Sequence, residues 1–222
     1  MDQYTNLLVL QNLYRMQALG YCYVDPIKTT TLTPPSFYPT VAQNLDQLHH
    51  TIEKCHLCDL SKSRKQAMCG YGNRNADLFI IDFSVSEIQD NTQNYFAGRS
   101  GETLKKMLQN VLQITPDEVY FTHAIKCKPL LQQQPTQAHF QTCQAHLLMQ
   151  LQFVQPKVIM VLGQEAFTTL TSQKENFEDI RGHVMNFHNY KMVALYHPQH
   201  LLRNPHLKKI TLQDLKTIKS CL

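Results

Sequence analysis

The fold class is decided by the stretch Val158-Ile159-Met160-Val161-Leu162-Gly163-Gln164-Glu165-Ala166-Phe167-Thr168-Thr169-Leu170. It begins with an apolar run, which is typical of a strand buried on both faces of a sheet. Gly163 closes this strand, and residues 165–170 are predicted to form a short helix. A strand that leads directly into a helix indicates an α/β fold.

The same alternation continues on both sides of this unit. Alternating elements imply parallel strands covered by helices on both faces of the sheet. We therefore expect a three-layer α/β/α domain with a short central parallel sheet. Strands and helices are predicted in turn at residues 78–83, 100–113, 119–122, 136–153, 192–195 and 207–221.

The N-terminal segment differs in composition from the rest of the 222-residue chain. Residues 1–24 have the apolar spacing of an amphipathic helix, and residues 26–42 are rich in proline and threonine, as in an extended linker. A helical pattern resumes at residue 43. We therefore place an N-terminal helix and Pro/Thr-rich linker at residues 1–42 and the α/β domain at residues 43–222.

Composition and charge exclude several classes of protein. Apolar residues make up 43% of the chain and charged residues 17%, so the chain can bury a core. No apolar run approaches the ~18 residues of a membrane helix, which excludes an integral membrane protein. The N-terminus lacks the basic and apolar regions of a signal peptide, so we expect a cytoplasmic protein. Residues 181–222 hold seven basic residues and one acid, which is either a solvated face or a phosphate-facing surface.

Four of the seven cysteines have the spacing of a metal site. Cys55 and Cys58 form a CxxC pair, Cys127 follows a predicted strand, and Cys143 lies on the next predicted helix. Such a set suits either Zn²⁺ or an iron–sulfur cluster, and spacing alone does not separate the two. His56 is a further candidate ligand, and the simpler interpretation makes Cys127 and Cys143 ordinary core residues.

A histidine–proline turn follows the last predicted strand. The carboxyl ends of parallel strands carry the ligand crevice, and His197 lies at such an end. Leu201 and Leu202, next to Arg203, suit a wedge that enters a base stack. The simpler interpretation is a surface histidine followed by two core leucines.

Several motifs share one order along the chain. In this order and spacing they resemble the iron–sulfur class of uracil-DNA glycosylases, often called family 4, from about residue 55 to residue 219. They include Cys55-x-x-Cys58, Gly70-x-Gly72-Asn73-x-Asn75-Ala76-Asp77-Leu78, Phe96-x-Gly98-Arg99-Ser100-Gly101, Lys126-Cys127-x-Pro129, Leu162-Gly163, Ile180-Arg181-Gly182 and His197-Pro198-x-x-Leu201-Leu202-Arg203-Asn204-Pro205.

This resemblance implies a cofactor and roles for individual residues. His197 would donate a hydrogen bond to O2 of the base, and Phe96 would stack on the flipped ring. Leu201 and Leu202 would fill the space that the base leaves. The resemblance also implies contacts of Ser100 and Arg203 with DNA, and a [4Fe–4S] cluster, with zinc as the alternative, on Cys55, Cys58, Cys127 and Cys143.

Two positions depart from the pattern of the family. Where the family has Gly-Glu-x-Pro-Gly after the first strand, this chain has Ile81-Asp82-Phe83-Ser84-Val85. Asp82 would replace the glutamate as the carboxylate that orients water, and Phe83 would occupy part of the base site. His123 stands where the family has an asparagine, so we expect weaker discrimination of uracil from cytosine. The simpler interpretation of His123 is a core histidine bonded to the backbone.

Three functions compete at this point. The first is a monomeric DNA glycosylase that removes uracil or a related deaminated base from single- or double-stranded DNA. The second is a catalytically inactive iron–sulfur protein of the same fold that binds DNA. The third is a zinc-stabilised α/β enzyme that acts on a small metabolite.

Overall fold

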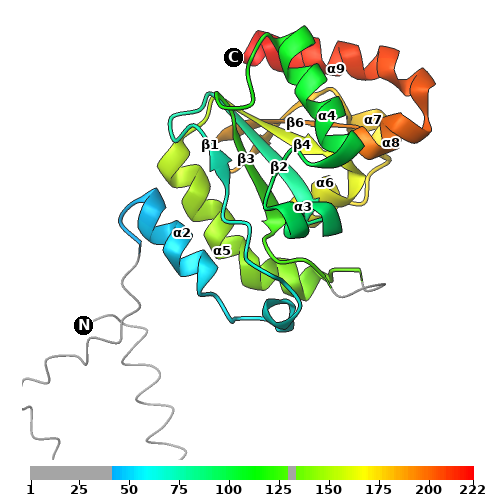
Figure 1. The fold of residues 1–222 in the computed structure, drawn as a ribbon. Coiled ribbons are helices and arrows are strands. Elements are labelled where there is room, and N and C mark those ends of the chain that lie inside the picture. Colours follow the sequence, from blue (N-terminus) through cyan, green and yellow to red (C-terminus); the bar gives the residue numbers. More distant parts are fainter. Residues whose placement is uncertain (1–41, 130–133) are drawn as a thin grey trace, which may run out of the picture. The chain divides into compact units, whose positions relative to one another are not determined.

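A six-stranded sheet forms the centre of the fold, with the strand order β1-β3-β2-β4-β6-β5 (Figure 1). The four inner strands run parallel, and the two edge strands are antiparallel to their neighbours. The bounds of the strands are β1 Tyr71–Gly72, β2 Leu78–Ser84, β3 Tyr120–Ile125, β4 Val158–Leu162, β5 Val184–Phe187 and β6 Tyr190–Leu195.

This computed structural model describes residues 42–129 and 134–222. The predicted N-terminal helix and nearly all of the predicted linker therefore lie outside the described residues. Residues 42–222 form one compact unit. Within the described ranges, the helices are all too short or too polar to span a lipid bilayer.

Helices cover both faces of the sheet. α5 packs on β3, and α6 packs on β2, β4 and β6. α9 packs on β4 and β6, and it also contacts η2, which continues α4. The right-handed rule for parallel crossovers places α5 and α6 on one face of the sheet and α4 with η2 on the other. The contact of α9 with η2 places α9 on this second face. The helices are α2 Leu45–Glu53, η1 Asp59–Lys62, α3 Glu87–Thr92, α4 Gly98–Met107, η2 Leu108–Leu112, α5 Gln137–Val154, α6 Gly163–Thr171, α7 Phe177–Ile180, α8 Pro198–Arg203, η3 Pro205–Leu207 and α9 Lys208–Cys221.

The structure confirms the expected three-layer α/β/α fold and adds elements that the sequence pattern did not predict. The two antiparallel edge strands were not predicted, because β1 has only two residues and β5 is largely exposed. The short helices α3 and α7 were not predicted either. α3 is held by a capping box in which Ser86 and Gln89 satisfy each other's backbone N–H groups.

The direction in which successive strands are added to the sheet reverses at β2. The crossover through α4 leads from β2 to β3 on one side, and the next crossover leads back past β2 to β4 on the other side. Such a switch point leaves a crevice at the carboxyl ends of the strands. The fold therefore predicts the position of a ligand site.

Candidate active site and cysteine cavity

A cleft of about 990 Å³ lies at this position. Asp82 and Phe83 from the end of β2, Gly163 at the start of α6, and His197 after β6 line its inner part. The segment from α3 to α4 and the short helix α8 form its outer walls. The cleft is thus built by loops that a rigid parallel sheet holds in place.

Asp82 and His197 face each other inside the cleft. The Nε2 atom of His197 lies 3.3 and 3.4 Å from the two carboxylate oxygens of Asp82. The two residues come from β2 and from the end of β6, with β4 between them in the sheet. The side chains therefore meet across the end of β4.

Gly163 makes this meeting possible. It lies at the end of β4 with a φ of +87°, and a Cβ atom there would lie 3.0 Å from Cβ of His197. Any other side chain would be strained at this φ and would press on the histidine. Gly163 in the Leu162-Gly163 motif thus leaves room for His197 and also allows the turn from β4 into α6.

The backbone of α8 sets the orientation of the His197 ring. His197 is the N-cap of α8, and its Nδ1 atom accepts a hydrogen bond from the backbone N–H of Gln199 at 3.1 Å. Pro198 occupies the first turn, where its fixed φ suits a helix start. Because Nδ1 is an acceptor, the proton of the neutral ring is on Nε2, which faces Asp82 and the cleft.

Burial and pairing have opposite effects on the pKa values of this pair. Burial is the largest single influence on the pKa of Asp82 and raises it, but the charge and the hydrogen bond of His197, with smaller contributions from His123 and the backbone N–H of Phe83, together hold this pKa below its ordinary value. Burial is also the largest single influence on the pKa of His197 and lowers it, but the charge and the hydrogen bond of Asp82, with a smaller contribution from Glu165, together raise this pKa above its ordinary value. Each partner therefore favours the charged form of the other.

His123 lies beneath the cleft in an aromatic cluster. Its ring centroid is 5.4 Å from the rings of both Tyr95 and Phe121. The side chain is fully buried, and neither ring nitrogen has a hydrogen-bond partner in the described part of the chain. Burial lowers the pKa of His123 to about 4, so the ring is neutral at neutral pH. The histidine is therefore in the core, but it is not bonded to the backbone there.

The aromatic wall of the cleft is formed by residues other than the predicted one. Tyr95 and Phe121 line the cleft, whereas Phe96 is buried and packs edge-on against Phe121 and Tyr71. Phe96 is therefore not among the residues that line the cleft, and its stacking on the base stays a prediction. Phe121 was detectable from the sequence, because it alternates with His123 along β3 and shares its face.

The predicted DNA contacts do not all reach the cleft. Phe83, Ser100, Leu202 and Arg203 line the cleft. Leu201 is 2% exposed and belongs to the core, whereas Leu202 is 39% exposed at the mouth of the cleft. In a helix, consecutive side chains point in different directions, so Leu202 is the leucine that faces outward here.

The four predicted ligand cysteines line one cavity. Cys55 and Cys58 lie between α2 and η1, Cys127 follows β3, and Cys143 lies on α5. Chain segments far apart in the sequence thus meet at this point. His56, the alternative ligand, is not among the residues that line the cavity.

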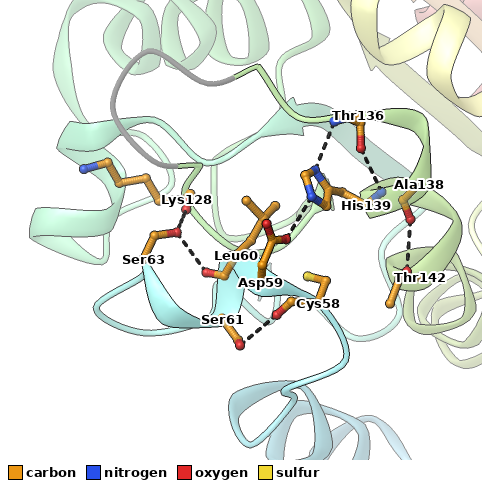
Figure 2. A network of polar contacts seen from close by, with 10 residues as sticks. All are labelled: Cys58, Asp59, Leu60, Ser61, Ser63, Lys128, Thr136, Ala138, His139 and Thr142. Carbon is orange, nitrogen blue, oxygen red and sulfur yellow. Dashed lines mark hydrogen bonds and ion pairs between the residues drawn. The ribbon is translucent and has the colours of Figure 1, made fainter.

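Polar contacts fasten the loop of Cys58 to the elements around it (Figure 2). Asp59 pairs with Nε2 of His139 at 2.9 Å, and Nδ1 of this histidine accepts the backbone N–H of Thr136 at the start of α5. Ser63 donates to the backbone oxygen of Lys128, beyond Cys127, at 2.7 Å. These contacts hold the loop, β3 and α5 in register around the cavity.

The chemistry of this cavity suits a thiolate-bound group. Arg64 donates from Nη1 to the Sγ atom of Cys127 at 2.8 Å, and Lys126 and His146 also line the cavity. Among the described residues, no carboxylate lines it. Nor does the described part of the chain hold three or more His, Cys, Asp or Glu side chains in a group that could hold a metal ion as they stand. Four thiols surrounded by nitrogen donors fit an anionic metal–thiolate group.

Comparison with known proteins gives consistent matches. The family model of the uracil DNA glycosylase superfamily matches residues 69–216. The chain is 28% identical over 187 residues to the type-4 uracil-DNA glycosylase of Saccharolobus solfataricus, which covers 81% of this chain and 87% of that protein. It is 30% identical over 173 residues to the type-4 uracil-DNA glycosylase of Thermotoga maritima, which covers 76% of this chain and 90% of that protein.

Proposed function

This chain belongs to the uracil DNA glycosylase superfamily, and from this premise we propose that it hydrolyses the N-glycosidic bond of uracil, or of a related deaminated base, in DNA. The observation that carries the proposal is the pair of Asp82 and His197 inside the cleft at the switch point. The reaction is the first step of base excision repair.

His197 is suited to stabilise the departing base. Breaking the N-glycosidic bond leaves negative charge on the base oxygens, and a donor aimed at that charge lowers the barrier. Nδ1 of His197 is occupied by the backbone of Gln199, so Nε2 is the ring nitrogen that can donate to the base. In the neutral ring Nε2 already carries the proton, so His197 can donate from Nε2 while Nδ1 keeps its hydrogen bond from the backbone N–H of Gln199.

Asp82 is suited to act on the sugar and on water. The sugar gains positive charge as the bond breaks, and a carboxylate beside it stabilises that charge. The lowered pKa of Asp82 keeps it ionised, as both this role and the orientation of water require. Asp82 Oδ1 also accepts the backbone N–H of Phe83 at 2.7 Å, which holds the carboxylate at the end of β2.

A site for a flipped base needs an apolar wall for stacking and polar groups that recognise the edge of the base. We propose that Tyr95 and Phe121 form the wall, with Phe83 opposite, since all three line the cleft. His123 contacts this wall, and neither of its ring nitrogens has a hydrogen-bond partner among the described residues. It would reach the edge of the base after a small shift of the aromatic cluster. A neutral imidazole would then offer the base either a donor or an acceptor, whereas the amide of an asparagine offers both.

DNA is the partner in this proposal, and the protein is expected to act as a monomer in the cytoplasm. Ser100, Leu202 and Arg203 at the cleft mouth would contact the strand that carries the base. The support for a [4Fe–4S] cluster on Cys55, Cys58, Cys127 and Cys143 is their shared cavity. When bound, the cluster would rigidly connect the loop of Cys55 and Cys58 with the end of β3 and with α5. Zinc bound by the same four cysteines is the alternative.

The test is a cleavage assay on labelled oligonucleotides with one uracil, single-stranded or paired with guanine. After protein treatment and hot alkali, we expect a cut at the uracil. His197→Ala should lower the rate by about 10²–10³-fold, as loss of one donor to a developing anion does. His50→Ala, an exposed histidine on α2, is the matched control and should leave the rate unchanged.

No cut at uracil, hypoxanthine or xanthine, with an intact metal site, would contradict the proposal. Salt-dependent DNA binding without base release would then identify a DNA-binding protein of the same fold. An unchanged rate in His197→Ala would remove His197 from the mechanism. These outcomes separate the role of the fold from the role of one residue.

A further inference from the structure

Lys126 is a buried lysine that has no acidic partner in the part of the chain that the structure describes. Its side chain is 1% exposed at the end of β3. The Nζ atom donates to the backbone oxygen of His123 at 2.7 Å and to Oγ1 of Thr122 at 3.0 Å. It forms no ion pair with any residue that the structure describes. A buried ammonium that lacks a counter-charge is destabilising, so an anionic group nearby would stabilise it.

The cysteine cavity holds the candidate for that balance. Lys126 lines this cavity together with Arg64 and His146. Arg64 spans the cavity edge, since Nη1 reaches Cys127 and Nη2 donates to the backbone oxygen of Cys55 at 2.7 Å. The Nε2 atom of His146 is buried and has no partner within the described residues.

These three side chains surround the thiols with positive charge and hydrogen-bond donors. Neutral thiols are weak acceptors and would not balance a buried cation. Four thiolates around an iron–sulfur core carry net negative charge, and hydrogen bonds to their sulfurs and nearby charges set the reduction potential. The donor set of the cavity therefore matches an anionic occupant.

We propose that Lys126 is the counter-charge of the [4Fe–4S] cluster and ties the cluster to the strand end beneath the cleft. This inference rests on the cluster of the proposed function. The cation faces the cluster, while its hydrogen bonds hold the backbone of His123 and the side chain of Thr122. Lys126 is thus a positioning residue that connects the cofactor with the wall of the base site.

The test compares Lys126→Met, Lys126→Gln and the control Lys62→Met in full-length protein purified without oxygen. Methionine fills the same buried space without charge, and glutamine keeps a hydrogen-bond donor. Lys62 is an exposed lysine on η1, four residues beyond Cys58, and does not line the cavity. Iron and sulfide content, the midpoint potential and the rate of cluster loss in air are measured for each protein.

We expect both Lys126 variants to bind the cluster with a more negative midpoint potential, because removing a nearby positive charge makes reduction harder. Cluster loss in air should accelerate on the order of 10-fold, as for other groups that support a metal site. Lys62→Met should match the unmodified protein in both measurements. The Gln variant separates charge from hydrogen bonding, since it keeps a donor toward His123.

Two results would overturn the inference, and they differ from each other. An unmodified protein without iron and sulfide would refute the cluster and, with it, the role of Lys126. An unmodified protein with a full cluster, whose potential and lifetime Lys126→Met and Lys126→Gln leave unchanged, would refute the role of Lys126 alone. Uracil excision measured on the same samples reports on the proposed function independently.

Discussion

The two ring nitrogens of His197 have separate tasks. Nδ1 caps α8 through the backbone of Gln199, and Nε2 faces the Asp82 carboxylate. The sequence pattern predicted both residues as part of the site but assigned Asp82 to water alone. The structure shows that Asp82 also acts on the charge of His197, so the two residues should be treated as one unit.

Asp82→Asn should lower the pKa of His197. With the carboxylate removed, burial dominates, so we expect the histidine pKa to fall below the ordinary value of 6.5. NMR titration of the ring protons measures this directly. A histidine pKa that stays raised in the variant would show that another group supplies the charge.

The same pair makes stability depend on pH. The raised pKa of His197 means that its stabilisation is fully present below the unfolded pKa of about 6.5 and is lost as pH rises through the folded value. The lowered pKa of Asp82 adds stability that is present above about 3.9 and is lost as pH falls through its folded value. Urea unfolding across this range should show both losses, and Asp82→Asn should remove them.

Gly163→Ala should damage the site more than it damages the fold. The positive φ costs about 1 kcal/mol for a residue with a Cβ atom, and the new methyl group would push His197 away from Asp82. A displacement near 1 Å lowers kcat by up to about 10²-fold. Ile218→Val, a core change on α9 with a cost of about 0.5–1.5 kcal/mol, is the control for stability. Equal activity of the two variants would contradict this role of Gly163.

At the scale of elements, α8 and its N-cap combine three roles within seven residues. Its N-cap is His197, its inner face contributes Leu201 to the core, and its outer face presents Leu202 and Arg203 to the cleft mouth. The sequence pattern treated the two leucines as equivalent. The helical geometry separates them, because a turn of about 100° lies between neighbouring residues.

Substitution of the two leucines of α8 should therefore have different effects. Leu201→Ala should lower the free energy of unfolding by about 2–5 kcal/mol, as other buried leucines do. Leu202→Ala should change stability by no more than about 0.5 kcal/mol but lower excision from double strands more than from single strands. Chemical unfolding and paired assays on both substrates measure this. A duplex-specific defect in Leu201→Ala would reverse the assignment.

At the scale of the whole molecule, the basic residues and the four candidate ligand cysteines are both distributed over distant segments of the chain. The basic excess of residues 181–222 is partly structural: Arg181 forms a buried ion pair with Asp214, and Lys219 donates to the backbone oxygen of Val111. The phosphate-facing interpretation thus applies to fewer residues than the sequence suggested. The cysteine cavity, in contrast, joins α2, β3 and α5 and so bears on the stability of the whole domain.

Loss of one cysteine ligand should lower the stability of the whole domain. Cys143→Ser should lower iron content and reduce Tm by on the order of 10 °C, since each kcal/mol lost moves Tm by about 2–4 °C in a chain of this size. Cys221→Ser, at the end of α9 and away from the cavity, should change neither quantity. Zinc in place of iron in the unmodified protein would support the zinc alternative.

The sequence pattern indicated the α/β class and the positions of the central strands, and the family resemblance implied the candidate ligands and separate roles for Asp82 and His197; their contact with each other comes from the tertiary structure. These features depend on local apolar patterns and on motif order, which a chain carries along its length. Only the tertiary structure shows which leucine lines the cleft, that Tyr95 and Phe121 line it while Phe96 does not, and that Lys126 lines the cavity of the cysteines. Those properties depend on the packing of side chains from different elements, which no local pattern encodes.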